Sequence, residues 1–265
     1  MIELRNKVIW LTGASSGIGE ALAYQLSEAG ATLILSARRE GELKRVRGAC
    51  SHPEQVYVVP LDLMNMEGIE ALVSDWVKKL GTVDILVNNG GISMRATVAE
   101  ASMEVHRRMM EVNFFGQIAL ARAVLPHMLA SGFGQMVVVS SLTGKFGFPL
   151  RSSYAASKHA LHGFFETLHL ECMDRGVQVS MINPGRIATE ISLHALNPDG
   201  SAQGSMDPSL AKGMSAEECA RQIVKSLCSR RYETTIGSFG QRFLVRLKGI
   251  SAGLFHRIAK QVPAK

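Results

Sequence analysis

The chain has 265 residues, of which 46% are hydrophobic and 20% charged, a composition that excludes a disordered chain and suits one globular domain with a large core. Its net charge of +6 comes from basic residues spread along the chain without interleaved aromatics, so we expect no nucleic acid partner. The four cysteines lack disulfide or metal-site spacing, and the first apolar run is too short for a signal peptide or membrane span, so we expect reduced thiols, no metal and a cytoplasmic location.

Short apolar runs rich in β-branched residues recur along the chain and predict strands. Stretches long enough for crossover helices separate them, and Gly30 stands where the first such helix would end. Nearly continuous apolar runs are typical of strands covered on both faces. The pattern predicts an α/β fold: a single-domain, Rossmann-like, doubly wound parallel sheet with helices on both faces. The predicted strands are residues 8–11, 32–35, 56–59, 85–87, 136–139 and 177–182.

A glycine-rich turn, Thr-Gly-Ala-Ser-Ser-Gly-Ile-Gly at residues 12–19, follows the first strand and opens the first helix. Backbone amides and the positive end of a helix can hold a pyrophosphate at such a turn. The spacing differs from the G-x-G-x-x-G fingerprint, so the position between strand and helix carries the argument. The expected cofactor contacts from this turn are Gly13, Ser15, Ser16, Gly17, Ile18 and Gly19.

The end of the second predicted strand indicates which nicotinamide cofactor would bind. An acidic residue there accepts hydrogen bonds from the adenosine ribose of NAD, whereas the 2′-phosphate of NADP needs a cation. Arg38, supported by Ser36 or Arg39, favours NADP(H), because a guanidinium binds phosphate through paired hydrogen bonds. The alternative is that both arginines are solvated, and Glu40 nearby is a complication. The adenine end of the site is assigned to Asp62 and Leu63.

Ser140 and Ser141 end the fifth predicted strand, and Tyr154 and Lys158 begin the helical stretch that follows. Residues four apart lie on one face of a helix. A free phenol titrates near pH 10, and a neighbouring ammonium lowers that pKa by stabilising the phenolate. Tyr154 is therefore a candidate proton donor to a forming alkoxide, with Lys158 as the group that lowers its pKa.

In this order the motifs resemble the full set of the short-chain dehydrogenase/reductase family, over nearly the whole chain up to about residue 190. A Tyr-x-x-x-Lys pair occurs by chance in many helices, but the ordered set does not. The matching positions are residues 12–19, residues 88–91 (Asn-Asn-Gly-Gly), Asn113, Ser141, Tyr154, Lys158 and Pro184-Gly185.

The resemblance implies a catalytic role for four residues. Tyr154 would be the acid/base, Lys158 would bind the nicotinamide ribose and lower the tyrosine pKa, and Ser141 would bind the substrate oxygen. Asn113 would hold a water that links Lys158 to solvent. Ser141 is preferred over Ser140 because the family's serine stands thirteen positions before its tyrosine, and strand alternation would point the two serines to opposite faces.

The resemblance also implies the remaining contacts to the cofactor. Asn88 would close the far side of the cofactor site, and Gly90 stands where the family usually has alanine, which loosens the turn slightly. The segment after residue 183 would hold the nicotinamide carboxamide. The residues expected to bind the cofactor in these segments are Asn89, Gly90, Tyr154, Lys158, Pro184, Gly185, Ile187 and Thr189.

Periodicity is lost over residues 186–214, and this segment ends at the capping-box sequence Ser215-x-x-Glu218. Long irregular segments inside compact domains are often lids, so we expect a lid within a catalytic domain of residues 1–240. The alternative is a surface loop without contact to substrate.

Residues 241–265 mix apolar and basic side chains at helical spacing, interrupted by Gly249 and Gly253. Three roles stay open for this tail: it packs over the substrate pocket, pairs with another subunit, or makes a peripheral contact with an anionic membrane.

The helix after Tyr154 carries His159, His162 and His169, which lack the pattern of a metal site and are interpreted as surface or interface side chains. In the family this helix often builds a dimer interface. The resemblance therefore implies a homodimer or homotetramer.

The sequence favours an NADP(H)-dependent oxidoreductase that moves hydride between the nicotinamide and a carbonyl/alcohol pair, with Tyr154 as acid/base. The preferred small-molecule substrate is an apolar ketone or aldehyde. A 3-oxoacyl reductase, or an alcohol or hydroxysteroid dehydrogenase, would use the same residues. An NADPH-binding sensor or scaffold is the non-enzymatic alternative, and it would not require a complete proton-transfer set.

Overall fold

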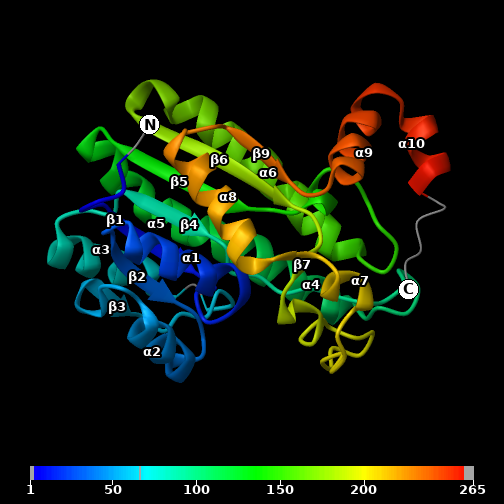
Figure 1. Ribbon diagram of the computed structural model, residues 1–265, viewed down its shortest axis with the longest axis horizontal. Helices are drawn as coiled ribbons and strands as arrows, with labels where there is room; N and C mark the ends of the chain where they lie inside the picture. The colour runs from blue at the N-terminus through cyan, green and yellow to red at the C-terminus, as the bar shows by residue number, and fades with distance from the viewer. Residues whose placement is uncertain (1–2, 66, 260–265) are drawn as a thin grey trace.

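A computed structural model describes residues 3–65 and 67–259. Its main sheet is parallel throughout and has the strand order β3-β2-β1-β4-β5-β6-β9 (Figure 1). The predicted α/β fold with a doubly wound sheet is confirmed, and each predicted apolar run is a strand. The strands are β1 Val8–Thr12, β2 Thr32–Ser36, β3 Val56–Val58, β4 Ile85–Asn88, β5 Gly134–Val139, β6 Val177–Pro184 and β9 Glu233–Ile236.

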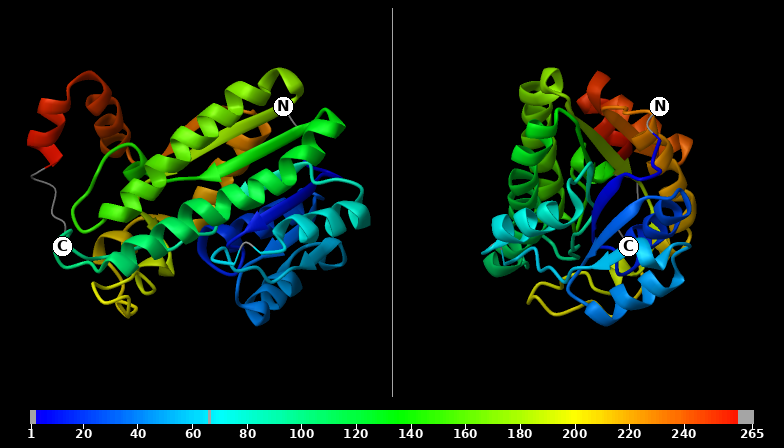
Figure 2. Two further views of the ribbon diagram at one scale, coloured as in Figure 1. Left: turned by 180° about the vertical axis from the view of Figure 1, so that it is seen from behind. Right: turned by 90° about the vertical axis from the view of Figure 1, so that its left-hand side faces the viewer.

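Helices cover both faces of this sheet and bury a hydrophobic layer on each side (Figure 2). Side chains of β1 alternate between the layers: Ile9 and Leu11 face one, and Trp10 faces the other. The first layer contains α1 Gly17–Glu28, α2 Glu40–Ala49 and α8 Ala216–Cys228. The second contains α3 Ile69–Leu80, α5 Gly116–Ser131 and α6 Ser152–Cys172.

Strand β9 was not predicted, and its composition explains why. Its sequence, Glu-Thr-Thr-Ile, contains one apolar residue, and only Ile236 is fully buried. The strand pairs with β6 alone, at the edge of the sheet, so it does not need the continuous apolar run of a central strand.

The segment of residues 186–214 has short elements of its own, β7 Ile187–Ala188, α7 Pro208–Ala211 and β8 Met214–Ser215. The expected capping box at its end forms only in part. Ser215 accepts the Glu218 backbone N–H at 3.2 Å, but the Glu218 carboxylate instead accepts from Arg221 and Gln222. Short α4 Met103–Met110 lies near this segment (Figure 1).

The C-terminal tail forms α9 Phe239–Ile250 and α10 Ala252–Ala259, and a boundary at residue 240 falls inside α9. The helices are interrupted at Ser251, whose backbone is extended, and both Gly249 and Gly253 lie within helices, so the expected interruption was misplaced. Lys260 and the residues after it lie outside the described residues. Within the described ranges, every helix is too short or too polar to cross a membrane.

The interpretation of the α6 histidines as surface or interface side chains is wrong for His162. His162 is half-buried, its Nε2 lies 3.0 Å from Oδ1 of Asn183, and burial lowers its pKa to about 4. His169 accepts the Val179 backbone N–H through Nδ1 at 3.3 Å. His159 is exposed, as expected.

Candidate active site

Two connected cavities open where β1, β4 and β5 end, next to the point where the strand order reverses from β1 to β4. Ligands bind at such switch points in open α/β sheets. One cavity, of about 360 Å³, is lined by the glycine-rich turn, and the other, of about 460 Å³, is lined by Tyr154 and Lys158. The residues that line both are Ile18, Asn89, Gly91, Ile92, Thr189 and Ile191.

The glycine-rich turn has the backbone conformation that its sequence requires. Gly13 and Gly17 have φ angles of 66° and 56°, in the left-handed region that favours glycine. A Cβ on Gly19 would lie 2.0 Å from the Gly13 carbonyl oxygen, so the turn closes only without a side chain there. The Ser16 hydroxyl makes no capping bond at the start of α1. This turn therefore has the space and the donors to hold a cofactor pyrophosphate.

The Thr12 side chain fixes the end of β4 against this turn. Its hydroxyl accepts the backbone N–H groups of Asn89 and Gly90, both at 3.0 Å. The Asn89 amide donates in turn to the Thr12 carbonyl at 3.1 Å. Asn89 lines both cavities, whereas the neighbouring Asn88 is fully buried and lines neither, so the expectation that Asn88 closes the cofactor site is wrong.

Gly90 packs against Leu63, which the sequence assigned to the adenine end of the site. A Cβ on Gly90 would lie 2.9 Å from Cδ1 of Leu63. The Leu63 side chain therefore occupies the place that an alanine methyl would take. Its exposed neighbour Asp62 lines the same cavity and accepts the Met64 backbone N–H at 3.0 Å.

The candidate cations for a 2′-phosphate are both exposed at the rim of the smaller cavity. Arg39 donates to the Ser15 hydroxyl at 3.4 Å, and Arg38 has no hydrogen-bond or ion-pair partner within the described part of the chain. Ser36 also lines the cavity, but its hydroxyl is buried and accepts from the Trp10 indole N–H at 2.9 Å.

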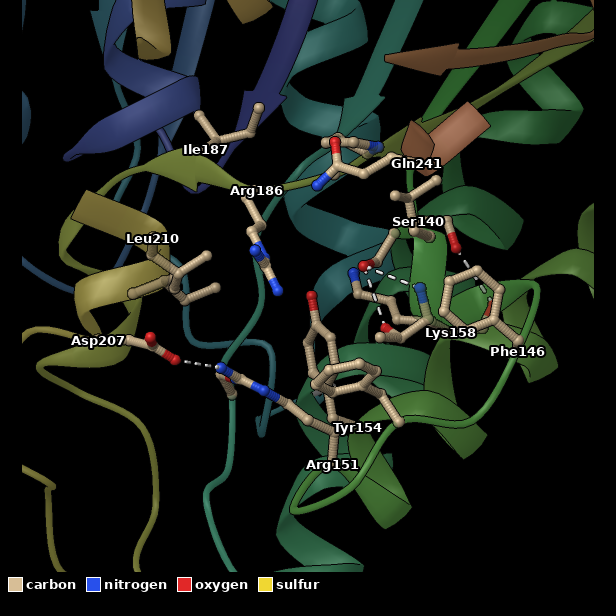
Figure 3. Close-up of a pocket in the computed structure, with 18 of the residues that line it drawn as sticks. Ser140, Phe146, Arg151, Tyr154, Lys158, Arg186, Ile187, Asp207, Leu210 and Gln241 are labelled. Atoms are coloured by element: carbon tan, nitrogen blue, oxygen red, sulfur yellow. Dashed lines mark hydrogen bonds and ion pairs between the residues drawn. The ribbon is translucent and has the colours of Figure 1, made fainter. Parts of the chain in front are cut away.

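Ser141, Tyr154 and Lys158 all line the larger cavity. Figure 3 shows Tyr154 and Lys158 beside each other there. The Ser141 hydroxyl accepts from the backbone N–H and the hydroxyl of Thr143 at 3.2 and 3.0 Å. Ser140 is buried and donates to the Lys158 carbonyl at 3.3 Å, so it serves the packing of α6 against β5. The preference for Ser141 over Ser140 thus fits the placement of both hydroxyls.

Burial governs the titration of the tyrosine and the lysine. It raises the pKa of Tyr154, while the charge of Arg151 and the hydrogen bond to Ser141 act in the opposite direction. Burial also lowers the pKa of Lys158 to about 8. Its ammonium lies 5.9 Å from the Tyr154 ring centroid and donates to the Val139 carbonyl at 2.9 Å. The net direction for Tyr154 is opposite to the lowering expected from Lys158.

Asn113 lies in a π-helical turn, Glu111–Phe115, between α4 and α5. Such turns often occur at functional sites. Its side chain accepts the Ile92 backbone N–H at 2.8 Å and donates to the Ile92 carbonyl and the Ser157 hydroxyl at 2.9 and 3.2 Å. A Cβ on Gly91 would lie 3.0 Å from Oδ1 of Asn113 and 3.7 Å from Nζ of Lys158. The missing side chain leaves room between these two groups.

The tail covers the larger cavity, as the first of its three expected roles describes. Gln241 in the first turn of α9 packs where Cβ atoms on Gly185 and Gly237 would lie, 2.5 Å from its Oε1 in each case. This contact anchors α9 on the Pro184-Gly185 segment. The apolar residues that line the cavity from the tail and from the loop before α6 are Phe146, Phe148, Pro149, Leu244, Phe255 and Ala259.

The 186–214 segment contributes to both cavities. Ile187 lines the larger one, and Thr189 lines both. Asp207 of this segment forms ion pairs with Arg95 and Arg151, so it joins the segment to the core beside Tyr154 (Figure 3). A surface loop without contact to the site would not have these positions.

Sequence reasoning missed four charged residues of the larger cavity: Arg95, Arg151, Arg186 and Asp207. The only signal for Arg186 was its place directly after Pro184-Gly185. Nothing in the sequence brings the other three together, because they come from distant parts of the chain.

Together the fold and the site define an α/β oxidoreductase of the dinucleotide-binding kind, and comparison with known proteins agrees. A family model described as short chain dehydrogenase matches residues 7–198. The chain is 38% identical over 258 residues to a Drosophila melanogaster protein named dehydrogenase/reductase SDR family protein 7-like, covering 96% of this chain and 79% of the relative. The chain therefore belongs to the short-chain dehydrogenase/reductase family.

Solved structures show the same fold. A short-chain dehydrogenase/reductase from Burkholderia phymatum in complex with NAD is 25% identical, with a TM-score of 0.84 and 96% of both chains covered. One from Burkholderia cenocepacia in complex with NADP is 24% identical, with a TM-score of 0.81 and coverage of 99% of this chain and 100% of that chain.

The buried Lys158 predicts a pH dependence of stability. Between its folded pKa of about 8 and the ordinary value near 10.5, the unfolded chain binds more protons at this lysine than the folded one, so its contribution to stability rises with pH. Lys158→Met removes this term. The free energy of unfolding of the wild type, measured in urea, should therefore increase relative to that of the variant as pH rises from about 8 to 10.

Lys44→Met, at an exposed lysine, is the control. The difference in unfolding free energy between this variant and the wild type should stay constant over the same pH range. If the difference in unfolding free energy between Lys158→Met and the wild type does not change with pH, the lowered pKa of Lys158 is contradicted.

Proposed function

We propose that this protein is an NADP(H)-dependent carbonyl reductase that acts on an apolar ketone or aldehyde. The observation that carries the proposal is the convergence of Ser141, Tyr154 and Lys158 in a cavity continuous with that of the glycine-rich turn. A nicotinamide cofactor bound across the two cavities would supply the hydride.

The chain's own residues would orient the substrate and move the proton. Ser141 holds the carbonyl oxygen, and the Tyr154 hydroxyl donates its proton to that oxygen as the alkoxide forms. Lys158 binds the nicotinamide ribose, and its charge stabilises the tyrosinate that results. Asn113 and the space beside Gly91 hold the water through which a proton from solvent returns. In the reverse reaction, the same groups would oxidise an alcohol to the carbonyl compound.

The remaining cofactor contacts follow the cavity lining. Gly13, Ser15, Ser16, Gly17 and Ile18 hold the pyrophosphate, and Asp62, Leu63, Asn89 and Gly90 surround the adenosine side. Gly19 is buried behind this lining, where its missing side chain lets the turn close. Pro184, Gly185, Ile187 and Thr189 hold the carboxamide, and residues 186–214 act as a lid over the bound pair.

Tyr154→Phe tests the proton transfer. General acid catalysis contributes about 10²–10⁴-fold, so we expect a loss of kcat of that size with little change in NADPH affinity. The measurement is NADPH oxidation against a panel of apolar ketones, aldehydes and 3-oxoacyl thioesters. Tyr57→Phe, whose ring packs on Trp76 away from the site, should keep full activity.

The same panel separates the alternatives. Turnover confined to 3-oxoacyl thioesters favours a 3-oxoacyl reductase. Oxidation of alcohols that is faster than reduction of ketones favours an alcohol or hydroxysteroid dehydrogenase. Tight NADPH binding with no turnover of any substrate would support the sensor or scaffold.

The preference for NADP(H) over NAD(H) is proposed from Arg38, with Arg39 in support. An exposed guanidinium at the cavity rim, without a partner in the described chain, is available to bind a 2′-phosphate. Glu40 does not compete for it, since its carboxylate pairs with Lys44 at 2.7 Å.

Arg38→Ala should raise the Km for NADPH about tenfold to a hundredfold, the effect of one charge-assisted contact, and leave that for NADH unchanged. Lys44→Ala, on α2 outside the cavity, is the control for a general change in charge. Equal changes for both cofactors would contradict a phosphate contact at Arg38.

We also propose a peripheral membrane contact through α9. Phe239, Phe243 and Ile250 are 79%, 49% and 84% exposed, and with Arg242 and Arg246 they follow one stripe of the helix. An exposed apolar stripe flanked by arginines suits an anionic lipid surface. The inner side of the helix contributes Leu247 to a buried cluster with Phe255 of α10, and it places Leu244 in the lining of the cavity.

Co-sedimentation with vesicles measures this contact. The protein should bind vesicles of anionic phospholipid, bind neutral ones more weakly, and lose binding at high salt. A variant with Phe239→Ser and Ile250→Ser should lose binding but keep NADPH oxidation, and Val98→Ser, at an exposed apolar residue outside the tail, is the control. Equal binding of the tail variant and the wild type would contradict the proposal.

A homodimer or homotetramer is proposed through α5 and α6. Leu170 and Met173, at and beyond the end of α6, are 69% and 44% exposed, and Phe115 at the start of α5 is 40% exposed. These apolar side chains would be covered by the same face of a second subunit.

A further inference from the structure

The charges that line the larger cavity are unbalanced. Within the described residues, its lining contains four cations and a single carboxylate, that of Asp207. Arg95 and Arg151 share this carboxylate, and Arg151 also donates to the Ser93 hydroxyl. Lys158 donates to the Val139 carbonyl. Arg186 is the remaining cation.

Arg186 extends its guanidinium into this cavity toward the Tyr154 hydroxyl (Figure 3). In the described part of the chain, no hydrogen bond or ion pair engages this side chain. Its backbone, by contrast, is fixed, because the Met214 N–H donates to the Arg186 carbonyl at 3.0 Å and Gly213 packs against that carbonyl. A held backbone and an unengaged guanidinium beside the reacting position are what an anion-binding residue needs.

The cofactor does not account for this arginine. Thr189, Glu190, Ile191 and His194 of the same segment line the cavity of the glycine-rich turn, where the cofactor phosphates would lie, and Arg186 does not. Arg186 lines only the cavity in which Tyr154 and the tail residues Leu244 and Phe255 also lie.

We infer that the substrate is a ketone or aldehyde with an anionic group close to its carbonyl and an apolar chain beyond it, and that Arg186 binds the anion. This inference rests on the proposed function and deepens it. The guanidinium pairs with the carboxylate or phosphate on one side of Tyr154, and the chain lies against the apolar residues of the loop before α6 and of the tail. Arg186 is thus a specificity-determining residue for the reaction.

The test compares matched substrates that differ only in charge, with the full chain and NADPH. One pair is a long-chain 2-oxo carboxylate and its methyl ester, and the other is the phosphate monoester of a long-chain hydroxyketone and the free hydroxyketone. We expect kcat/Km to favour the anion by about tenfold to a hundredfold in at least one pair, which then identifies the anion. Arg186→Met should abolish that preference, and Arg186→Lys should keep part of it.

Two controls separate the role of Arg186 from other effects. The Kd for NADPH should be unchanged in Arg186→Met, and kcat/Km for the neutral partner should fall far less than kcat/Km for the anion. A wild type that does not distinguish the members of either pair would overturn the inference. So would an Arg186→Met variant that loses NADPH affinity, because the arginine would then serve the cofactor.

If no ketone is turned over, the proposed function fails, and the inference is decided by binding alone. Calorimetric titration of the NADP-loaded protein with the 2-oxo carboxylate and with its ester gives the Kd for each. A tighter Kd for the anion in the wild type, lost in Arg186→Met, supports the anion site. Equal Kd values overturn it.

Discussion

The contact that the site depends on is the one between the Thr12 hydroxyl and the backbone that follows β4. At this point the strand order reverses, so the chain leaves two neighbouring strands in opposite directions and opens a crevice. The hydroxyl accepts two N–H groups at once, from Asn89 and Gly90, and thereby fixes the crevice wall against the glycine-rich turn. Gly90 in turn accepts at its carbonyl from the buried Gln117 of α5 at 2.6 Å. The two cavities meet along this wall.

Much of the fold could be predicted because central parallel strands must be apolar on both faces. That requirement marks the central strands β1, β2, β4, β5 and β6 in the sequence. The edge strands have less to bury: β3 was still predicted from its valines, whereas β9 has a single apolar residue and was missed. The motif residues could be placed because each is tied to an element end: the turn opens α1, Ser141 follows β5, and Tyr154 and Lys158 share a face of α6.

The rest of the site depends on contacts between distant segments that carry no periodicity. Asp207 meets Arg95 and Arg151 from positions far apart in the chain, and nothing local in the sequence indicates that meeting. The tail was recognised as amphipathic, but its inner face could be assigned only once Gln241 was seen against Gly185. The direction of the Tyr154 pKa also escaped sequence reasoning, because helical spacing indicates proximity to Lys158 but not the burial that opposes ionisation.

Burial of Lys158 and Tyr154 links stability and chemistry at this site. A lysine with a pKa near 8 destabilises the folded chain at neutral pH relative to a fully solvated one. The same low-dielectric surroundings strengthen every charge interaction within the cavity. The charge of Arg151 offsets part of the cost of ionising the buried Tyr154, and an anion beside Arg186 would gain from the same strengthening of charge interactions. Asp207 neutralises part of the positive charge of Arg95 and Arg151. Because Asp207 lies on the 186–214 segment, the net charge of the cavity depends on that segment staying packed against the core.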